Sequence, residues 1–479
     1  MTPKTWRRRG LLAVTVALAC FAAACGSDEA TSGEVATTAA AAATTVSAAG
    51  STATTAAATT AAATTTKAPK KASMAPAITE PVTIRFENYN LFSAGNLRDA
   101  TLKLLKNFEA ANPLIKVETT ATKDQEMFQS LQAQLVANKL PDVAQVLLRE
   151  WDQNIENLPL QVLEDLAGAD LDTHLSAVHA YHPKARALTV RDGKTQGLSY
   201  VFSTPTLFYN ATLMKQAGLD PATTPLQTWD QVAAAAAKVN AATGVDGLYI
   251  ACIELDWCTQ GLLLSNGGRV MSPDRKDITW AGAESVEVYK FWQNLVKTGA
   301  HSKLTGAQAQ DAFAAGKLGF FLQTSAVQGR MVTSSTGKWE LRSTGMPSFG
   351  TKTPVPVNSG AGLGIFSKDP VKQRAAWELV KYLTSAEAMQ VIVTEMGYLP
   401  LRVGMMDDPK FLANWDRRDL VLPNVKQLDG LQPSLSFPGP NALQIRDLFL
   451  KSLEQVLFNG ADPAATFAES QDRAKKLIR

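Results

Sequence analysis

The composition of the chain changes abruptly near residue 77. Between residues 36 and 66, 15 of the 31 residues are Ala and 12 are Thr, and none is charged. A segment without large apolar side chains cannot bury a core, and β-branched Thr opposes the helix that Ala alone would favour. We therefore interpret residues 26–76 as a flexible tether with a reach of about 40 Å by random-coil scaling. The folded part is expected in residues 77–479.

A basic start and a short apolar run precede the tether. Arginines at 7–9 lead into fifteen apolar or small residues, 10–24, a run too short to span a bilayer and typical of a secretory signal peptide. The sequence Ala22-Ala23-Ala24-Cys25 resembles the lipobox of bacterial lipoproteins, with Ala22 in place of the usual Leu. The resemblance implies a signal peptide over 1–24 and a lipid anchor on Cys25. Ordinary signal cleavage after an Ala-x-Ala sequence is the alternative.

The overall charge argues against one class of partner. The chain has 47 basic and 44 acidic residues, which gives a formal net charge of +3, so it lacks the basic excess of nucleic-acid-binding proteins. Its apolar fraction of 46% over 479 residues is ordinary for a globular protein and allows two or three domains. Nucleic acid is not expected as a partner.

Two cysteines remain in the predicted folded part. Cys252 and Cys258 lie six positions apart, and export out of the cytosol predicts that they form a local disulfide. His179 and His182 are a close pair, but no thiol or carboxylate cluster completes a metal site around them. We interpret the four histidines as surface or capping residues and expect neither a metal nor a cofactor.

Strand and helix patterns alternate along residues 80–400. Apolar alternation predicts strands at 82–86, 115–118 and 143–148, and helical spacing predicts helices over 97–108 and 131–136. The pattern recurs with a helix from 229 to Gly244, strands at 248–251, 316–322 and 362–366, and a long helix over 373–396. This alternation favours two α/β lobes with mostly parallel sheets, whose ligands lie beyond the carboxyl ends of the strands.

Two short strings imitate catalytic motifs. Ser335 to Lys338 matches S-x-x-K and Lys297 to Gly299 matches K-T-G, but their order is the reverse of that in penicillin-recognising enzymes. The glycine-rich run 360–364 has neither the spacing of a dinucleotide loop nor the ending of a P-loop. The sequence therefore predicts no catalytic residues.

A longer series of strings resembles one protein family. Residues 203–210, STPTLFYN, are followed by MKQAGLDP at 214–221 and TWD at 228–230. This order is similar to that of the family 1 extracellular solute-binding proteins of ABC importers. The resemblance continues through LLLSNGG at 262–268, FAAGK at 313–317, GYLP at 397–400 and the C-terminal helices from Gln444. It covers essentially residues 80–479.

The resemblance implies a periplasmic-binding-protein-like fold, in which two α/β lobes joined by a hinge enclose a ligand cleft. It places 77–204 and 356–400 in lobe 1, and 205–355 and 401–479 in lobe 2. Crossovers are expected near 203–205, near 355–359 and after Tyr398. Ligand that touches both lobes would supply the small free energy that closes the hinge.

Sugars present a hydroxyl rim and apolar ring faces, so a sugar site needs aromatic rings beside planar hydrogen-bonding groups. Tyr89, Trp257 and Tyr398 are the predicted aromatic residues, because each occupies a loop position where the cleft should form. The local disulfide would brace the loop that carries Trp257.

The predicted polar residues lie at crossovers and strand ends. They are Glu150 with Trp151 after the third strand, Ser203, Thr204, Ser325, Ser359, Gly360 and Arg446. Small residues let a ligand approach backbone N–H groups. Arg446 matches an arginine that glycerol-3-phosphate binders direct into the cleft, and a guanidinium also grips vicinal hydroxyls. The same binders carry Tyr-Glu where Leu147-Leu148 stands here, a departure that argues against their ligand.

These observations predict a lipid-anchored, non-enzymatic, monomeric binding subunit of an ABC importer at the outer face of the cytoplasmic membrane. Its ligand is expected to be a mono- or oligosaccharide, which it delivers to the permease subunits. Glycerol-3-phosphate or a glycerophosphodiester is the alternative ligand. A secreted carbohydrate-active enzyme is the alternative from a different functional class.

Overall fold

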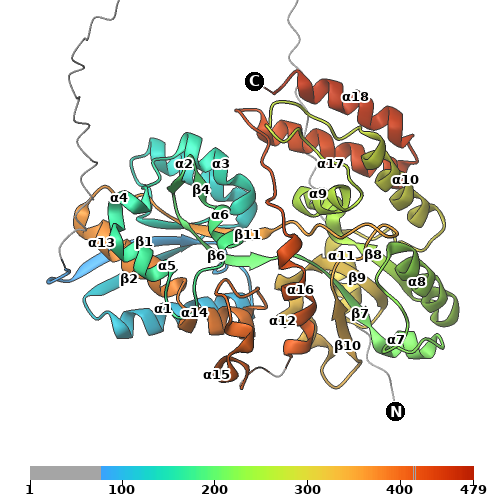
Figure 1. The fold of residues 1–479 in the computed structure, drawn as a ribbon, viewed down its shortest axis with the longest axis horizontal. Coiled ribbons are helices and arrows are strands. Elements are labelled where there is room, and N and C mark those ends of the chain that lie inside the picture. The colour runs from blue at the N-terminus through green and yellow to red at the C-terminus, as the bar shows by residue number, and fades with distance from the viewer. Residues whose placement is uncertain (1–76, 414, 416, 479) are drawn as a thin grey trace, which may run out of the picture. The chain divides into compact units, whose positions relative to one another are not determined.

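The structure is a computed structural model that describes residues 77–413, 415 and 417–478 (Figure 1). These residues form two α/β lobes, each with a central β-sheet covered by helices. The predicted signal peptide, Cys25 and the tether lie outside the described residues. Over the described ranges, no helix has both the length and the apolarity required of a membrane span.

The chain builds the first lobe, crosses to the second, returns, and ends in the second. The first passage through lobe 1 comprises β1 (Val82–Asn88), α1 (Asn96–Ala111), β2 (Ile115–Ala121), α2 (Met127–Val136), β3 (Val143–Leu147), α3 (Trp151–Asn157), α4 (Leu163–Ala167), α5 (Ala169–Leu175), α6 (Pro183–Ala187), β4 (Val190–Arg191), β5 (Lys194–Thr195) and β6 (Leu198–Ser203). The short 3-10 turns η1 (Asp124–Glu126) and η2 (Leu148–Glu150) follow β2 and β3.

The first passage through lobe 2 comprises β7 (Pro205–Asn210), α7 (Ala211–Gln216), α8 (Trp229–Thr243), β8 (Asp246–Ile250), η3 (Ala251–Glu254), α9 (Asp256–Ser265), α10 (Ala283–Lys297), α11 (Gly306–Ala314), β9 (Leu318–Thr324), η4 (Ser325–Val327), α12 (Gln328–Ser335) and β10 (Leu341–Thr344). The chain returns through β11 (Ser359–Ile365), α13 (Pro370–Leu383), α14 (Ala386–Val391), the π-helix η5 (Ile392–Met396), η6 (Met405–Asp407), α15 (Pro409–Leu412), η7 (Arg418–Leu420), α16 (Leu422–Lys426) and η8 (Leu428–Gly430). It ends with α17 (Ala442–Asn459) and α18 (Pro463–Lys475) in lobe 2.

Both large sheets are mixed, so the prediction of mostly parallel sheets is wrong. The lobe 1 sheet has the order β2-β1-β3-β11-β6, in which β1 is parallel to β2 and β3 but β11 is antiparallel to both of its neighbours. The lobe 2 sheet has the order β10-β7-β9-β8, and only β8 and β9 pair in parallel. β7 and β11 directly follow crossovers. They therefore enter their sheets from the end nearest the cleft. This makes them antiparallel to neighbouring strands whose carboxyl ends point towards the cleft.

The helix predicted from residue 229 to Gly244 corresponds to α8. Thr228 and Gln231 form the capping box that starts α8, and Gly244 ends that helix in the left-handed conformation with a φ of 70°. The long helix predicted over 373–396 is in fact three pieces, α13, α14 and η5. The break falls at Ser385, whose hydroxyl accepts a hydrogen bond from the Ala388 N–H as the N-cap of α14.

Each lobe has its own hydrophobic core. The first cluster takes its buried residues from 84–202 and 361–431, and the second takes them from 207–346, from Leu420 and from 437–474. Buried side chains from Leu401 to Leu431 thus pack mainly with lobe 1, whereas the sequence-based boundary assigned 401–479 to lobe 2. The exact lobe boundaries stay a prediction, and this packing argues for a return to lobe 2 after Leu431.

Three crossovers join the lobes, and they run close together (Figure 1). Thr204 alone separates β6 from β7, residues 345–358 lead from β10 to β11, and residues 432–436 lead to the second cluster. The latter two pair in parallel through Val357 and Gln432. Gln427 connects the first two crossovers. Its side-chain amide donates to the Pro205 carbonyl at 3.0 Å, and its side-chain oxygen accepts from the Met346 N–H at 3.0 Å.

A buried carboxylate in the first lobe supplies a stability prediction. Glu87 on β1 is 1% exposed and accepts hydrogen bonds from the hydroxyls of Thr122 and Ser130 and from the amide of Gln134. Glu87→Ala leaves these donors without an acceptor, so we expect the free energy of unfolding to fall by about 2 to 4 kcal/mol. Glu118→Ala, at an exposed position of β2, is the control and should change it by less than about 0.5 kcal/mol. Equal effects in urea denaturation would contradict the assignment.

His301 is buried, which corrects the interpretation of all four histidines as surface or capping residues. It is 1% exposed, its Nε2 accepts from the Ile250 N–H at 2.9 Å, and its Nδ1 lies 2.7 Å from the Ser302 carbonyl. His182 does cap a helix, because it accepts from the Lys184 N–H at the start of α6. Burial lowers the pKa of His301 to about 4.

This lowered pKa predicts a loss of stability in mild acid. The folded pKa lies below the ordinary value of 6.5, so the stability that neutral His301 contributes is complete above pH 6.5 and is lost as the pH falls towards 4. We expect this loss to be about 3 kcal/mol. His301→Gln retains a neutral donor and acceptor. Urea denaturation between pH 7.5 and 4.5 should therefore give this variant a shallower pH slope, and an unchanged slope would contradict the prediction.

Candidate functional site: a cavity between the lobes

A cavity of about 660 Å³ is lined by residues of both lobes. Asp124, Gln125 and Arg149 come from lobe 1, where they follow the carboxyl ends of β2 and β3. The lobe 2 side comprises Tyr249, Ile253, Glu254, Leu255, Asp256, Lys303, Leu304, Thr305, Arg446, Asp447, Leu450, Lys451, Glu454 and Phe458. A small molecule in this cavity would contact both lobes at once, as ligands of two-lobed α/β proteins must do to favour closure.

Four charged residues meet beside this cavity, and three of them, Arg149, Asp256 and Arg446, line it. Glu150 Oε1 lies 3.5 Å from Arg149 Nε and 3.8 Å from Arg446 Nη1, so a carboxylate of lobe 1 faces an arginine of lobe 2. Burial raises the pKa of Glu150, although both arginines oppose this shift. Burial alone would lower the pKa of Arg149, but Glu150, Asp256 and Asp124 together raise it. The predicted residues Glu150 and Arg446 are therefore neighbours, and Arg149 and Asp256 belong to the same cluster.

The two predicted tyrosines lie side by side in lobe 1. The side chains of Tyr89 and Tyr398 interact with each other, and both are buried. Burial raises the pKa of Tyr398 to about 12. Burial and contact with Tyr398 raise the pKa of Tyr89, with smaller effects from Asp124 and Arg149. Since Asp124 and Arg149 line the cavity, the tyrosine pair lies close behind its lobe 1 wall.

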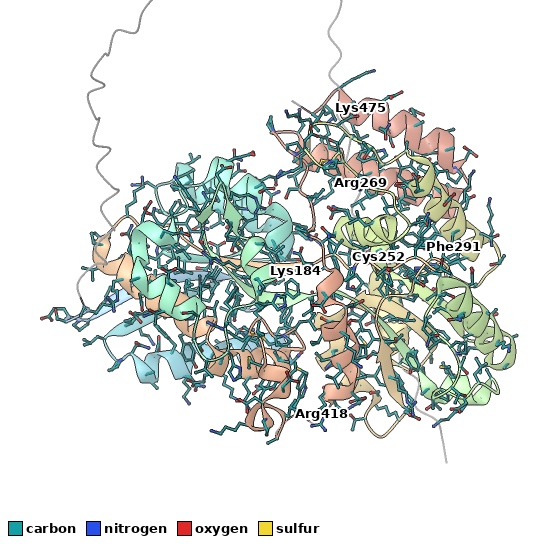
Figure 2. All side chains as sticks on the ribbon, in the orientation of Figure 1. Lys184, Cys252, Arg269, Phe291, Arg418 and Lys475 are labelled. Carbon is teal, nitrogen blue, oxygen red and sulfur yellow. A yellow bond between two sulfur atoms is a disulfide. The ribbon has the colours of Figure 1, made fainter. Side chains whose placement is uncertain are left out.

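The predicted disulfide between Cys252 and Cys258 is present, with a Cα–Cα distance of 4.9 Å. The enclosed loop contains Ile253, Glu254, Leu255 and Asp256, four consecutive residues of the cavity wall. Figure 2 marks Cys252 in the second lobe. The Glu254 carboxylate also accepts from the Gly306 N–H at 3.0 Å, so the loop is tied at its centre as well as at its ends.

Removal of this disulfide should affect both stability and binding. We expect the double variant C252A/C258A to lose about 2 kcal/mol of unfolding free energy, from loop-closure entropy alone. Ligand affinity should also fall roughly tenfold, because the wall residues 253–256 lose their fixed conformation. Urea denaturation and calorimetric titration of the same samples check the two effects. Unchanged affinity with lowered stability would limit the disulfide to a structural role.

The small residues predicted at the crossovers cluster around the hinge. Thr324 donates from its hydroxyl to that of Ser203 at 2.6 Å, and the Ser325 N–H donates to the Thr204 carbonyl at 3.1 Å. Ser359 pairs with Ser203 across the β11–β6 ladder. Ser325 is fully buried, and its hydroxyl has no hydrogen-bond partner among the described residues. The structure thus brings these residues together beside the crossovers.

The two predicted tryptophans are placed in the cores. Trp151 is fully buried in lobe 1, where its ring fills the space beside Gly197 and Gly362. Trp257 is 2% exposed and packs in the second cluster. Neither ring is among the residues that line the cavity, so their ring faces serve packing. The neighbouring residues Glu150 and Asp256 point to the interlobe region instead.

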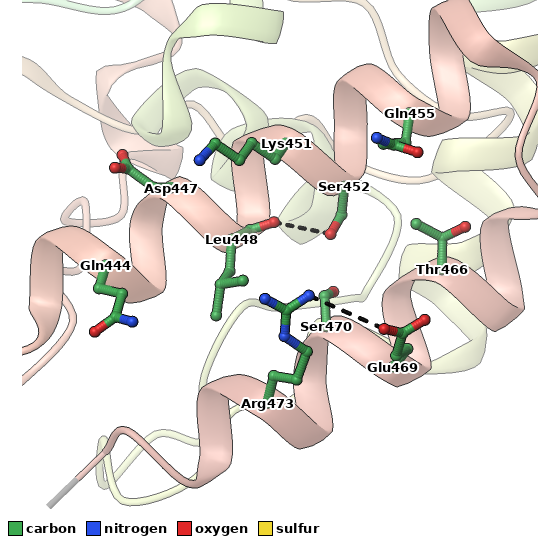
Figure 3. A pocket seen from close by; sticks show the side chains of 10 residues that line it. All are labelled: Gln444, Asp447, Leu448, Lys451, Ser452, Gln455, Thr466, Glu469, Ser470 and Arg473. Carbon is green, nitrogen blue, oxygen red and sulfur yellow. Dashed lines mark hydrogen bonds and ion pairs between the residues drawn. The ribbon is translucent and has the colours of Figure 1, made fainter. Parts of the chain in front are cut away.

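A second hollow lies between α17 and α18 (Figure 3). Its volume is about 430 Å³, and its lining is Gln444, Asp447, Leu448, Lys451, Ser452, Gln455, Thr466, Glu469, Ser470 and Arg473. All ten residues come from two helices of the same lobe. A ligand bound there would therefore not touch lobe 1 and could not favour hinge closure by contacting both lobes.

Sequence reasoning missed Asp124, Arg149 and Asp256. A usable signal exists, since each is a charged residue within a few positions of the carboxyl end of a predicted strand, where ligands of α/β sheets bind. On α17, Arg446 was predicted from the family resemblance, whereas Asp447, Lys451 and Glu454 carry no comparable signal. Their position on the cavity depends on how α17 packs against η3, α9 and α10.

The comparison with family models decides the family. The model described as "Bacterial extracellular solute-binding protein" matches residues 103–418. The chain belongs to this family. Among curated relatives, this solute-binding protein is 23% identical over 320 residues to the sn-glycerol-3-phosphate-binding periplasmic protein UgpB of Agrobacterium fabrum. That match covers 64% of this chain and 71% of the relative.

Solved structures resemble the solute-binding protein over nearly their whole length. UgpB from Mycobacterium tuberculosis in complex with glycerophosphocholine has a TM-score of 0.71 and 21% identity, covering 83% of this chain and 98% of that one. An ABC substrate-binding protein from Listeria monocytogenes in complex with cycloalternan has a TM-score of 0.71 and 19% identity, and the match covers 83% of this chain and 99% of that one. These likenesses confirm the predicted two-lobed α/β fold class.

Proposed function

We propose that this protein captures a mono- or oligosaccharide by hinge closure and delivers it to the permease of an ABC importer. The observation that carries the proposal is the 660 Å³ cavity with walls from both lobes. A ligand there gains contacts with both walls only when the lobes are closed, so its binding energy shifts the population towards the closed shape. A permease can then distinguish loaded from empty protein by shape.

The balance of charges favours a neutral ligand. The cavity lining carries nearly equal numbers of acidic and basic side chains, namely Asp124, Glu254, Asp256, Asp447 and Glu454 against Arg149, Lys303, Arg446 and Lys451. Arg149 and Arg446 already share Glu150. An added dianion would meet this carboxylate and Asp256, whereas neutral hydroxyls accept from the guanidinium groups and donate to the carboxylates.

The apolar part of the lining suits sugar ring faces. Ile253, Leu255, Leu304, Leu450 and Phe458 all contribute to the lobe 2 wall. Small-molecule sites usually combine a few polar groups, which fix the orientation of the ligand, with apolar surface. Here that apolar surface would cover ring carbons. In this proposal, the arginines and carboxylates select the hydroxyl pattern and the lobe 2 wall covers the ring faces.

Glycerol-3-phosphate or a glycerophosphodiester is the second candidate. Arg149 and Arg446 both line the cavity and both approach Glu150, and a pair of guanidinium groups suits a phosphate. The names of two similar proteins state that they bind such compounds, sn-glycerol-3-phosphate in one case and glycerophosphocholine in the other. A zwitterionic diester would tolerate the nearby carboxylates better than a phosphate monoester.

Titration of intrinsic tryptophan fluorescence, supported by calorimetry, tests these candidates. Maltose, maltotriose, glycerol-3-phosphate and glycerophosphocholine form the panel. Saturable binding of a sugar with no change in the sugar on chromatography supports the main proposal, and selective binding of either glycerol compound supports the second. Conversion of a sugar to a new product would instead support a carbohydrate-active enzyme and overturn the proposal that this protein is not an enzyme.

We also propose that the mature protein is a monomer held at the outer face of the cytoplasmic membrane by a lipid on Cys25. The support is the sequence of residues 1–25 and the extracellular character of the family. Mass spectrometry of the N-terminal peptide should find a diacylglycerol-modified Cys25, and Cys25→Ser should release the protein from membranes. An unmodified, released wild-type protein would contradict the anchor.

A further inference from the structure

One ion pair joins the lobes beside the cavity. Arg275, in the loop between α9 and α10 of lobe 2, places Nη1 2.5 Å from Oδ2 of Asp152 on α3 of lobe 1. Its Nη2 donates to the carbonyl of Ser436 in the third crossover at 3.0 Å. The Ser436 hydroxyl in turn donates to the carbonyl of Arg149 in the cavity wall. One guanidinium thus connects both lobes and a crossover.

The loop that carries Arg275 is braced by its own hydrogen bonds. Arg275 has a φ of 61°, in the left-handed region that non-glycine residues seldom occupy. The loop is fixed by Ser272, which donates to the Asp274 carboxylate at 2.6 Å and accepts from the Asp277 N–H at 3.0 Å. A left-handed residue kept in a braced loop costs free energy, which indicates that the loop serves to present the Arg275 side chain.

The lobe 1 partner is braced in the same way. Asp152 is only 12% exposed, and its other carboxylate oxygen accepts from Arg191. Arg191 is itself tied to the Val190 carbonyl at 2.7 Å. Because Asp152 is held by Arg191 and both side chains are largely shielded from water, the pair loses less conformational entropy on forming and is screened less than an exposed pair.

We propose that Arg275 is a positioning residue, a latch that holds the lobes in the closed arrangement by its contact with Asp152. The inference rests on the proposed hinge-closing function and adds a residue outside the cavity that sets how tightly the cleft closes. The nearby Glu150–Arg446 contact has the same polarity, with the carboxylate on lobe 1 and the arginine on lobe 2. Hinge opening would separate both pairs and expose four charges to water.

Arg275→Asn tests the latch without changing the loop. Asn tolerates the left-handed region, so the loop keeps its shape while the cation is lost. Lys276→Asn is the matched control, since Lys276 is exposed, lies next in the same loop and loses the same charge. Asp152→Asn is the second variant, which removes the anion at nearly constant volume.

The readout is the interlobe distance in the absence of ligand. Spin labels on Glu156→Cys of α3 and Lys290→Cys of α10, both at exposed positions, report it in the full chain with Cys25→Ser and the disulfide intact. We expect Arg275→Asn and Asp152→Asn to lower the ratio of closed to open molecules roughly tenfold. Lys276→Asn should match the wild type. Salt at about 0.5 M should lower this ratio more in the wild type than in Arg275→Asn, which lacks the latch but retains the Glu150–Arg446 contact.

Identical distance distributions and salt responses in the wild type and Arg275→Asn would overturn the latch. Because the measurement needs no ligand, it reports on the latch even if no sugar or glycerol compound binds. Failure of the proposed function would appear separately, as a lack of saturation in the ligand titrations. If the latch is correct and a panel compound binds, Arg275→Asn should weaken that compound roughly tenfold while Lys276→Asn leaves its affinity unchanged.

Discussion

Arg446→Ala should weaken ligand binding by about 2 to 3 kcal/mol, which is roughly 30- to 150-fold. Arg446 is a cationic group that lobe 2 contributes to the cavity wall, and its Nη1 lies 3.8 Å from Glu150 of lobe 1. Its removal takes away both a set of hydrogen-bond donors for the ligand and a partner for a buried carboxylate. Both losses are greatest in the closed, liganded state.

Lys451→Ala is the matched control for this prediction. Lys451 lies on the same helix, also lines the cavity and carries the same charge, but it is exposed, whereas Arg446 is partly buried. Its loss should change affinity by less than about threefold, because exposed charges are well solvated and screened. Arg446→Lys separates charge from geometry, since Lys lacks the planar fork of donors. Calorimetry with the compound that binds wild type gives all three values, and similar losses for Lys451→Ala and Arg446→Ala would contradict the assigned role.

Local sequence signals predicted the elements of the fold better than their arrangement. The capping box at Thr228 and the left-handed Gly244 define α8 within a few residues, so its bounds could be read directly. The direction of β11 could not be predicted from local signals, because it depends on a crossover from the other lobe and on pairing with β3 and β6, which are far away in the sequence. Adjacent strand and helix patterns do not encode which end of a sheet a returning strand enters.

The candidate site shows the same division between local and long-range information. Glu150 and Arg446 were predicted, and they converge although they lie in distant parts of the chain. Trp151 and Trp257 were chosen from loop positions after strands, but a loop position does not say which way a large ring points. Burial of an indole stabilises a core by a few kcal/mol. Both rings consequently face the lobe interiors, while the smaller charged neighbours differ from them: Asp256 lines the cavity and Glu150 contacts its arginines.

Gly360→Ala should destabilise the fold strongly, because a side chain at this position is opposed in two ways. Gly360 in β11 has a φ of +119°, and a Cβ there would collide with the backbone carbonyl of Val201 on β6. The free-energy cost of a strained φ in an L-residue therefore adds to the cost of separating two paired strands next to the hinge. Together these two penalties should lower the free energy of unfolding by about 3 kcal/mol or more.

Gly299→Ala separates these two penalties. Gly299 has a similar positive φ of +77°, but a Cβ there would meet nothing within 4 Å, so only the backbone term of about 1 to 2 kcal/mol applies. Urea denaturation gives both values, and proteolysis in urea gives them if Gly360→Ala is too unstable to purify in quantity. Equal losses would show that the strands can separate at little cost, and the β6–β11 contact would then not fix the geometry of the crossovers. A larger loss for Gly360→Ala, accompanied by weaker ligand binding, would connect the close approach of these two strands to the closure of the cleft.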